Sequence, residues 1–348
     1  MLNVLAEQAD KARAILSPEV LDYFSAGAGD EVTVEESGPA WDRFRLRPWP
    51  LRNVESVDTA TRLLGDQFAT PIAVAPSAFH LLAHPEGERA SIAGAGAAEA
   101  LFVLSTRASL TIADVAAASS APWWFQVYVM RNRELTAKVV EDAVVAGARA
   151  LVLTGDTPYV GRKRRVNGER IPMPDDHYLI NISRHLPPGV DGRDAAAQDP
   201  SIDLATIGWL KSLSGLPVLV KGVLRGDAAV ACLDAGADGI IVSNHGGRQL
   251  DRAIPSALAL AEVVEFVGDR APVLVDGGIR SGTDVLIALT LGAAGVMVGR
   301  PALWGLAAEG AAGVRSMLEA LTEDLSHVMA LAGVTDLRSL RPDLVVQI

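Results

Sequence analysis

Residues 243–251, with the sequence SNHGGRQLD, place His245 and Arg248 three positions apart in a glycine-rich stretch. An imidazole titrates near neutral pH, so it can take a proton from a reacting hydroxyl group. A guanidinium offers parallel N–H donors that match the two oxygens of a carboxylate. These residues therefore predict a general base and a carboxylate-binding cation on one loop.

Glycines and arginines also stand close together near the end of the chain, in the segments DGGIRSGTD and GRP. Glycine lets backbone amides approach an anion closely, and Arg280 and Arg300 would add charged donors. The late loops of α/β barrels commonly bind phosphate in this way, with a helix N-terminus contributing. We expect a phosphorylated ligand here, although a sugar-phosphate substrate would give the same pattern.

The charge of the chain limits the partners that it can bind. The net charge is −11 and the isoelectric point is about 5.1, which argues against a surface for nucleic acid. The four cations at 162–165 follow Asp156 closely and predict a local cluster that attracts an anion. His80 and His84, with Pro85 beside them, form a weak metal pair, so we expect no metal.

The elements that must position these residues are eight short runs rich in Val, Ile and Leu, separated by segments of helical periodicity. Nearly continuous apolar strands are buried on both faces, as in a parallel sheet covered by helices. Eight such units close a barrel, so the predicted fold is a (β/α)₈ TIM barrel of the α/β class, with a doubly wound open sheet as the alternative. The runs are residues 71–77, 101–105, 123–129, 150–156, 217–222, 239–245, 272–278 and 295–301.

Chemistry in such a barrel is expected at the carboxyl ends of the strands. Each of the eight runs ends in polar side chains, so groups that are distant in sequence are predicted to converge on one mouth. These side chains are Ser77, Ser105, Gln126, Tyr128, Thr154, Asp156, Lys221, Asn244, His245, Asp276 and Arg300.

We expect one domain over residues 1–348, because a single barrel with insertions reaches this length. Residues 1–70, with a helix over 17–26, would form a helical cap over one end of the barrel. The barrel itself would cover 71–321, and a C-terminal segment would follow over 322–348.

Five segments, in this order along the chain, resemble one enzyme family: YFSAGAGDE, AHPEGE, LVKG, SNHGGRQLD and DGGIRSGTDV. The family is that of the FMN-dependent 2-hydroxy-acid oxidases and dehydrogenases, which includes glycolate, lactate and mandelate enzymes. The resemblance covers nearly the whole chain. It implies an oxidoreductase that binds FMN and oxidises a small (S)-2-hydroxy acid to the 2-oxo acid.

The resemblance also implies roles for individual residues. His245 would be the catalytic base, with Asp156 orienting it and stabilising the imidazolium that forms. Tyr128 would act with them at the reacting hydroxyl group. Tyr23 and Arg248 would hold the substrate, with Arg248 pairing its carboxylate.

A larger set of residues would bind FMN. Lys221 counts among the catalytic residues as well, since a cation there favours the anionic, reduced cofactor. Ala78 would leave room near the flavin, which does not by itself establish reaction with oxygen. The implied contacts are Ala78, Ser105, Gln126, Thr154, Lys221, Ser243, Asp276, Gly278, Arg280, Gly299 and Arg300.

Three features depart from the family pattern. The family's substrate arginine usually stands second after the glycine of a DTPxxG motif, where DTPYVGRK has Lys163. Lysine keeps the charge but loses the planar fork, so either Lys163 substitutes for it or Arg162 or Arg164 turns in. Arg107 stands where several members carry an aromatic residue, and it predicts a second anionic or polar group on the substrate. Residues 166–203 are divergent and weakly periodic, and we expect a long loop after the fourth strand, a candidate lid.

The sequence leaves the electron acceptor and the substrate open. The first interpretation is an oxidase that uses oxygen and forms hydrogen peroxide. The alternatives are a dehydrogenase with another acceptor, a specialised biosynthetic oxidation of a modified hydroxy or amino acid, and a flavin-binding protein without catalysis. No apolar stretch reaches the ~20 residues that cross a bilayer, so we expect a cytoplasmic protein without a membrane partner. The resemblance implies a homo-oligomer, a tetramer.

Overall fold

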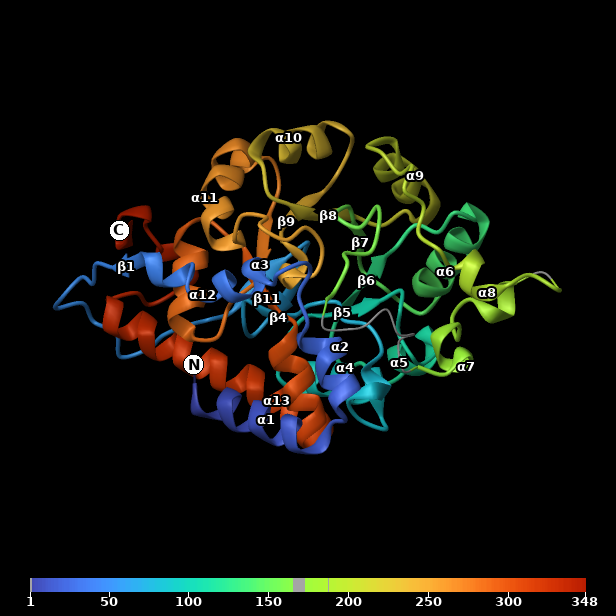
Figure 1. Ribbon diagram of the computed structural model, residues 1–348. Helices are drawn as coiled ribbons and strands as arrows, with labels where there is room; N and C mark the ends of the chain where they lie inside the picture. The colour runs from blue at the N-terminus through green and yellow to red at the C-terminus, as the bar shows by residue number, and fades with distance from the viewer. Residues whose placement is uncertain (1, 165–172, 187) are drawn as a thin grey trace.

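Eight strands form a closed barrel at the centre of the molecule (Figure 1). The computed structural model describes residues 2–164, 173–186 and 188–348. The strands are β4 (Ile72–Val74), β5 (Phe102–Ser105), β6 (Trp123–Val127), β7 (Leu151–Thr154), β8 (Val218–Val223), β9 (Gly239–Val242), β10 (Val273–Asp276) and β11 (Gly295–Val298). They run parallel in the order β10-β11-β4-β5-β6-β7-β8-β9. All eight predicted strands are present, and the (β/α)₈ barrel is confirmed against the open sheet.

The continuous apolar runs reflect burial of each strand on two sides. Successive side chains point alternately into the barrel and out toward the helices. In β6, Trp124 packs in the barrel interior with Val103 and Val152, whereas Trp123 and Phe125 belong to the outer core. The interior is therefore filled by side chains, and a ligand site has to lie at the ends of the strands.

One helix follows each barrel strand and covers the outside of the barrel (Figure 1). Several of these helices begin at a side chain that accepts a backbone N–H of the first turn, as Thr111, Asn132 and Ser281 do. The helices are α4 (Gly87–Ala97), α5 (Ile112–Ala116), α6 (Arg133–Val145), α9 (Ala205–Ser214), α10 (Gly226–Asp234), α11 (Ser256–Val267), α12 (Gly282–Thr290) and α13 (Arg300–Ala332).

The N-terminal seventy residues reach both ends of the barrel, so the expected cap over one end was too narrow a description. Their elements are α1 (Asn3–Ile15), α2 (Pro18–Ser25), α3 (Val32–Ser37), η1 (Trp41–Arg43), β1 (Phe44–Leu46), β2 (Thr61–Leu63) and β3 (Asp66–Phe68). The predicted helix is α2, which starts at Ser17 and brings Tyr23 to the carboxyl ends of the strands. The hairpin of β2 and β3 closes the opposite end, where Leu63 and Phe68 join the interior cluster.

The helix α13 kinks at Glu309 and Gly310 and lies alongside α1 (Figure 1). The expected boundary after residue 321 falls inside this helix, because its apolar face stays buried as far as Met329 and Ala332. The chain ends in the short helices η6 (Leu337–Ser339) and η7 (Pro342–Leu344) and in β12 (Val345–Gln347), which pairs with β1. Within the described part of the chain, no helix is both long and apolar enough to cross a bilayer.

Between β7 and α9 the chain forms the short helices α7 (Asp175–Tyr178), η3 (Ser183–His185) and α8 (Gly192–Ala195). Asn181 anchors this segment, since its amide accepts from the Ile112 N–H and donates to the Leu110 carbonyl, both at 2.9 Å. Of the candidate lid, 166–172 and 187 lie outside the described residues, as does Arg165 of the basic run.

Candidate active site

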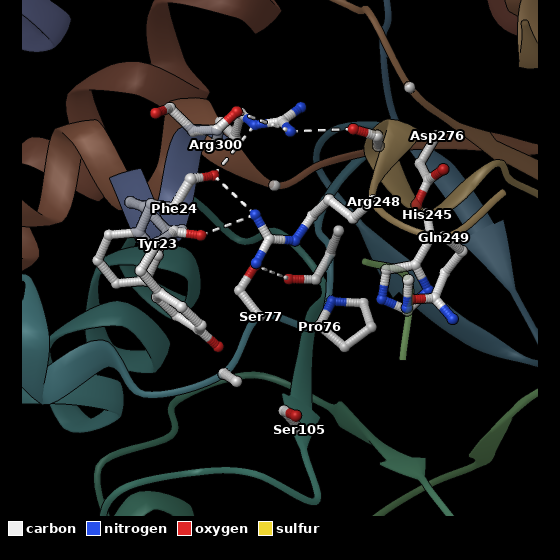
Figure 2. Close-up of a pocket in the computed structure, with 18 of the residues that line it drawn as sticks. Tyr23, Phe24, Pro76, Ser77, Ser105, His245, Arg248, Gln249, Asp276 and Arg300 are labelled. Atoms are coloured by element: carbon white, nitrogen blue, oxygen red, sulfur yellow. Dashed lines mark hydrogen bonds between the residues drawn. The ribbon is translucent and has the colours of Figure 1, made fainter. Parts of the chain in front are cut away.

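A cavity of about 1220 Å³ opens at the carboxyl ends of the barrel strands, with side chains from both halves of the chain around it (Figure 2). One small ligand typically fills a pocket of about 300–1,000 Å³, so this cavity has room for two bound molecules. Of the residues predicted for the site, Asp156, Ser243 and Asn244 do not line the cavity. Asp156 and Ser243 lie directly behind the lining, in contact with His245 and Lys221. Asn244 is buried, and its side-chain oxygen accepts from the Gly247 N–H at 3.3 Å. The others line the cavity: Tyr23, Ala78, Ser105, Arg107, Gln126, Tyr128, Thr154, Lys163, Lys221, His245, Arg248, Asp276, Gly278, Arg280, Gly299 and Arg300.

His245 is held between polar partners from two other strands. It begins the turn η4 (His245–Gly247) after β9 and has a left-handed backbone, with a φ of 57°. Its Nδ1 lies 3.0 Å from Asp156 Oδ1, and its Nε2 lies 3.4 Å from the Tyr128 hydroxyl oxygen. Its backbone N–H donates to Ser243 Oγ at 3.0 Å. The ends of β6, β7 and β9 therefore meet at one imidazole.

The Asp156 carboxylate decides which imidazole nitrogen carries the proton. Burial raises the pKa of this carboxyl, but the charge of His245, its hydrogen bond and Lys221 together lower the pKa by more, to below its usual range. Asp156 is thus ionised and can only accept, so His245 Nδ1 is the donor. In the neutral imidazole the lone pair is then on Nε2, which lies beside Tyr128 at the cavity, as a general base requires.

Tyr23 and Tyr128 are neutral hydrogen-bond donors at this mouth. Burial is the main reason that the pKa of each phenol is raised, and the negative charge of Asp156 adds to the effect at Tyr128. Both hydroxyl groups therefore stay protonated at physiological pH. A protonated phenol can donate to a carboxylate or to a hydroxyl oxygen of a ligand.

Arg248 reaches across the mouth to the end of α2 (Figure 2). Its Nη1 donates to the carbonyls of Tyr23, Phe24 and Ala26 at 2.8, 3.2 and 2.9 Å. Its guanidinium carbon lies 5.4 Å from the centre of the Tyr23 ring. These carbonyls fix the orientation of the guanidinium but are neutral, so they leave its positive charge available to an anion in the cavity.

The chain turns Lys163 toward the cavity, whereas Arg162 and Arg164 are exposed. Arg164 pairs with Asp30 at the surface. Burial, and then the charge of Arg248, lower the pKa of Lys163 to about 8. Of the two alternatives for the missing family arginine, the geometry favours Lys163 itself.

A buried ion pair joins the ends of β8 and β10 at the barrel mouth. Lys221 Nζ lies 2.7 Å from Asp276 Oδ2 and donates to Ser243 Oγ at 2.6 Å. Lys221 is 4% exposed and Asp276 is 7% exposed. Asp276 Oδ1 is buried and has no hydrogen-bond partner among the described residues, so it is an acceptor for a donor that enters the cavity.

Ser105, Gln126 and Thr154 form a chain of hydrogen bonds across three adjacent strands. Ser105 Oγ donates to Gln126 Oε1 at 3.1 Å, and Gln126 Nε2 donates to Thr154 Oγ1 at 2.8 Å. All three side chains are buried and line the cavity. They present fixed donors and acceptors to a planar polar ring.

The two helices that follow the predicted phosphate loops differ at their N-termini. The amides at the start of α12 and just before it already have partners: Asp284 accepts from the N–H groups of Arg280 and Ser281, and Asp324 accepts from the Gly282 N–H. The start of α13, at Arg300, lines the cavity instead. Arg300 is oriented by the carbonyls of Phe24 and Gly246, at 3.2 and 2.9 Å (Figure 2).

A family model described as FMN-dependent dehydrogenase matches residues 12–347. The chain belongs to this family. The predicted family is thereby confirmed, and FMN is the cofactor of this oxidoreductase.

Relatives of the chain agree with it over nearly their full length. The chain is 41% identical over 349 residues to an L-lactate oxidase of Nostoc sp. (strain PCC 7120 / SAG 25.82 / UTEX 2576), covering 97% of this chain and 96% of the relative. It is 43% identical to a peroxisomal (S)-2-hydroxy-acid oxidase of Oryza sativa subsp. japonica, over 94% and 91% of the two chains. A solved structure of mandelate oxidase with (S)-4-hydroxymandelic acid has a TM-score of 0.90, 38% identity and 97% coverage of both chains.

The side chains around the cavity fit FMN, which combines a polar ring system, a chain of hydroxyl groups and a phosphate. The unpartnered Asp276 Oδ1 suits a hydroxyl donor, and the Gln126 hydrogen bonds suit a ring with donors and acceptors. Arg280 and Arg300 suit the phosphate. Gly278 lies so close to the Ser37 carbonyl, 1.9 Å from an added Cβ, that only glycine lets the loop pass there.

Sequence reasoning missed Gln249, Tyr178 and Arg193, which also line the cavity. Gln249 follows Arg248 within the SNHGGRQLD motif, and its amide donates to the carbonyls of Asp156 and Tyr159 at 3.0 and 2.9 Å. Its place in the motif was a usable signal. Tyr178 and Arg193 come from the weakly periodic segment after β7, where no spacing in the sequence distinguished them.

Proposed function

We propose that this enzyme oxidises an (S)-2-hydroxy acid to the 2-oxo acid and passes the electrons to dioxygen. The observation that carries the proposal is the imidazole of His245, fixed by Asp156 at 3.0 Å in one cavity with Arg248. A base beside a carboxylate-binding cation matches the two adjacent functional groups of a 2-hydroxy acid. The relatives named as L-lactate oxidase and (S)-2-hydroxy-acid oxidase support the substrate class, its configuration and the acceptor.

The substrate carboxylate binds between Arg248 and Lys163, which both line the cavity. Tyr23, whose ring lies against Arg248, donates its phenol to the same carboxylate. Tyr128 donates to the substrate hydroxyl oxygen, and this places the hydroxyl proton opposite His245 Nε2. Orientation by several fixed groups lowers the entropic part of the activation barrier.

His245 Nε2 accepts the hydroxyl proton as the C–H bond is oxidised. The imidazolium that results is paired with the ionised Asp156, whose buried carboxylate favours the charged ring. When bound, FMN would supply the acceptor for the α-hydrogen and the two electrons of the C–H bond, with dioxygen as the final acceptor that yields hydrogen peroxide. Ala78 at the cavity wall carries only a methyl group, which leaves space for dioxygen.

The test is anaerobic mixing of the purified holoenzyme with a panel of (S)-2-hydroxy acids, followed by admission of air. We expect loss of the flavin absorbance with at least one acid, then its recovery together with one equivalent of hydrogen peroxide. Loss of absorbance without recovery in air would identify a dehydrogenase with another acceptor. A flavin that no acid reduces would contradict the proposal and favour a specialised biosynthetic substrate.

The assembly and the location of the enzyme are further proposals. We infer a homo-oligomer, a tetramer, from the family resemblance in the sequence, and light scattering after size-exclusion chromatography tests it. We also propose a cytoplasmic location, with which the acidic composition of the chain is compatible. Localisation of a tagged full-length chain tests this point.

A further inference from the structure

Arg107 is a buried cation at the cavity that the proposed chemistry does not use. It is 9% exposed and lines the cavity two residues beyond the end of β5. Its Nη2 donates to the Ala196 carbonyl, and its guanidinium carbon lies 5.4 Å from the centre of the Tyr178 ring. Its Nη1 is buried and has no hydrogen-bond partner among the described residues.

Among residues 2–164, 173–186 and 188–348, the contacts of Arg107 leave its charge uncompensated. The Ala196 carbonyl is neutral, and a ring face attracts a cation only weakly. Arg193 also lies over the Tyr178 ring, with its guanidinium carbon 4.1 Å from the ring centre. Unlike Arg107, it is paired with Asp175. A buried guanidinium with a free donor is costly unless an anion completes it.

The register of the barrel places Arg107 beside the catalytic groups. Ser105 and Gln126 are paired neighbours on β5 and β6. Arg107 and Tyr128 each follow two residues later, just beyond the ends of these strands, and the Tyr128 N–H donates to Thr106 Oγ1 at 3.0 Å. The charge of Arg107 also acts on the phenols of Tyr23 and Tyr128, where it lowers the pKa against the larger effect of burial. Arg107 therefore faces the substrate part of the cavity.

The phosphate of FMN does not account for this cation. The phosphate donors Arg280 and Arg300 follow β10 and β11, whereas Arg107 follows β5, and β4 lies between β5 and β11 in the barrel. An anion that pairs with Arg107 therefore belongs to the substrate, which is held near Tyr128 and His245.

We propose that Arg107 binds a second carboxylate on the substrate, so that the preferred substrates are (S)-2-hydroxy dicarboxylic acids. The inference rests on the proposed function, because it assigns the first carboxylate to Arg248 and Lys163. A planar guanidinium with a free Nη1 is suited to a terminal carboxylate. Gln198, two residues beyond Ala196, also lines the cavity.

The loop that carries Arg107 is fixed before any substrate arrives. The Arg107 carbonyl accepts from the Phe79 N–H at 3.1 Å, and its own N–H donates to Ser105 Oγ at 3.1 Å. Two residues on, the buried Glu88 accepts from the backbone N–H of Ser109 at 2.9 Å. A side chain on a fixed loop loses little freedom on binding, which favours affinity for the second carboxylate.

The experiment compares substrates matched in length that differ only in the second carboxylate. The holoenzyme is mixed anaerobically with (S)-2-hydroxyglutarate or (S)-2-hydroxypentanoate, and with (S)-malate or (S)-2-hydroxybutanoate, while flavin reduction is followed. We expect kcat/KM to be at least about 100-fold higher for one dicarboxylate than for its matched monocarboxylate, because the monocarboxylate leaves a buried cation unpaired. Glutarate, which cannot be oxidised at a hydroxyl group, should perturb the flavin spectrum at lower concentration than pentanoate does.

Two substitutions separate binding by Arg107 from general attraction to the cavity. Arg107→Leu should abolish the preference through a rise in KM for the dicarboxylate, with little change in kcat for the monocarboxylate. Arg131→Leu removes an exposed cation at the rim of the same cavity and should keep the preference. If Arg107→Leu does not fold, the glutarate and pentanoate titrations of the unchanged enzyme still test whether the cavity prefers a second carboxylate.

The outcomes for this proposal and for the proposed function differ. Faster reduction by the monocarboxylates, or equal binding of glutarate and pentanoate, overturns the assignment of Arg107 and leaves the hydroxy-acid oxidase standing. Failure of all mono- and dicarboxylic 2-hydroxy acids overturns both. A preference that survives Arg107→Leu shows that another group binds the second carboxylate and also overturns the assignment.

Discussion

The imidazole of His245 and the carboxylate of Asp156 meet at 3.0 Å although β8 lies between the strands that carry them. The residues follow β9 and β7, so closure of the barrel, and no local turn, brings them together. A second pair of the same kind, His185 and Asp142 at 2.7 Å, lies away from the cavity. Substitution of Asp142 in this second pair therefore serves as a control for substitution of Asp156.

Asp156→Asn should lower the rate of anaerobic flavin reduction by about 10³–10⁴-fold, because the amide no longer fixes the tautomer or stabilises the imidazolium. KM should change little, since the carboxylate-binding groups remain. Asp142→Asn removes the partner of His185 and should leave the rate within about twofold of the unchanged enzyme. Similar losses in the two variants would show that the Asp156 effect is structural.

Lys221→Met should destabilise the apoprotein by about 3–5 kcal/mol, because it leaves the buried Asp276 carboxylate without its partner at 2.7 Å. Urea unfolding of the apoprotein measures this change. Lys211→Met breaks an exposed pair with Asp238, also at 2.7 Å, and should cost no more than about 1 kcal/mol. Equal losses in the two variants would contradict a buried, energetically coupled pair.

The sequence was informative wherever a residue is tied to a barrel strand. Each apolar run marked a strand, and the polar residue at its end, such as Gln126 or Lys221, then had to face the mouth. The signal was local in both cases: burial on two faces produces the run, and the end of the strand places the side chain.

The sequence was less informative where contacts depend on distant segments. Leu63 and Phe68 lie on three-residue strands that are too short to show periodicity. Their side chains nevertheless fill the end of the barrel opposite the active-site cavity. The glycine-rich loop before α12 suggested an anion site, but the sequence did not show that Asp324, 42 positions from Gly282, accepts from the Gly282 N–H. Tyr178 and Arg193 were missed because packing on the barrel positions them, and this packing leaves no spacing in their own segment.

The pKa of Lys163, lowered to about 8, predicts how substrate capture depends on pH. Below pH 8 the amine is charged and binds the substrate carboxylate with Arg248, whereas above pH 8 the charge is lost. We expect kcat/KM to fall by about tenfold or more as the pH rises through this value, with KM carrying most of the change. Lys163→Arg should abolish this fall, because guanidinium stays charged. An identical decline in Lys163→Arg would assign the titration to another group.

Gly278→Ala should weaken FMN retention at least tenfold, because an added Cβ would lie 1.9 Å from the Ser37 carbonyl oxygen. The residue also has a φ of 80°, which costs an L-residue about 1–2 kcal/mol by itself. Gly147→Ala is the matched control, since its φ is 95° and nothing lies within 4 Å of its added Cβ. Thermal unfolding of both apoproteins and flavin content after gel filtration separate the two effects. Full flavin content in Gly278→Ala, with a loss of stability no greater than in Gly147→Ala, would show that the loop can shift away from Ser37 and still bind the cofactor.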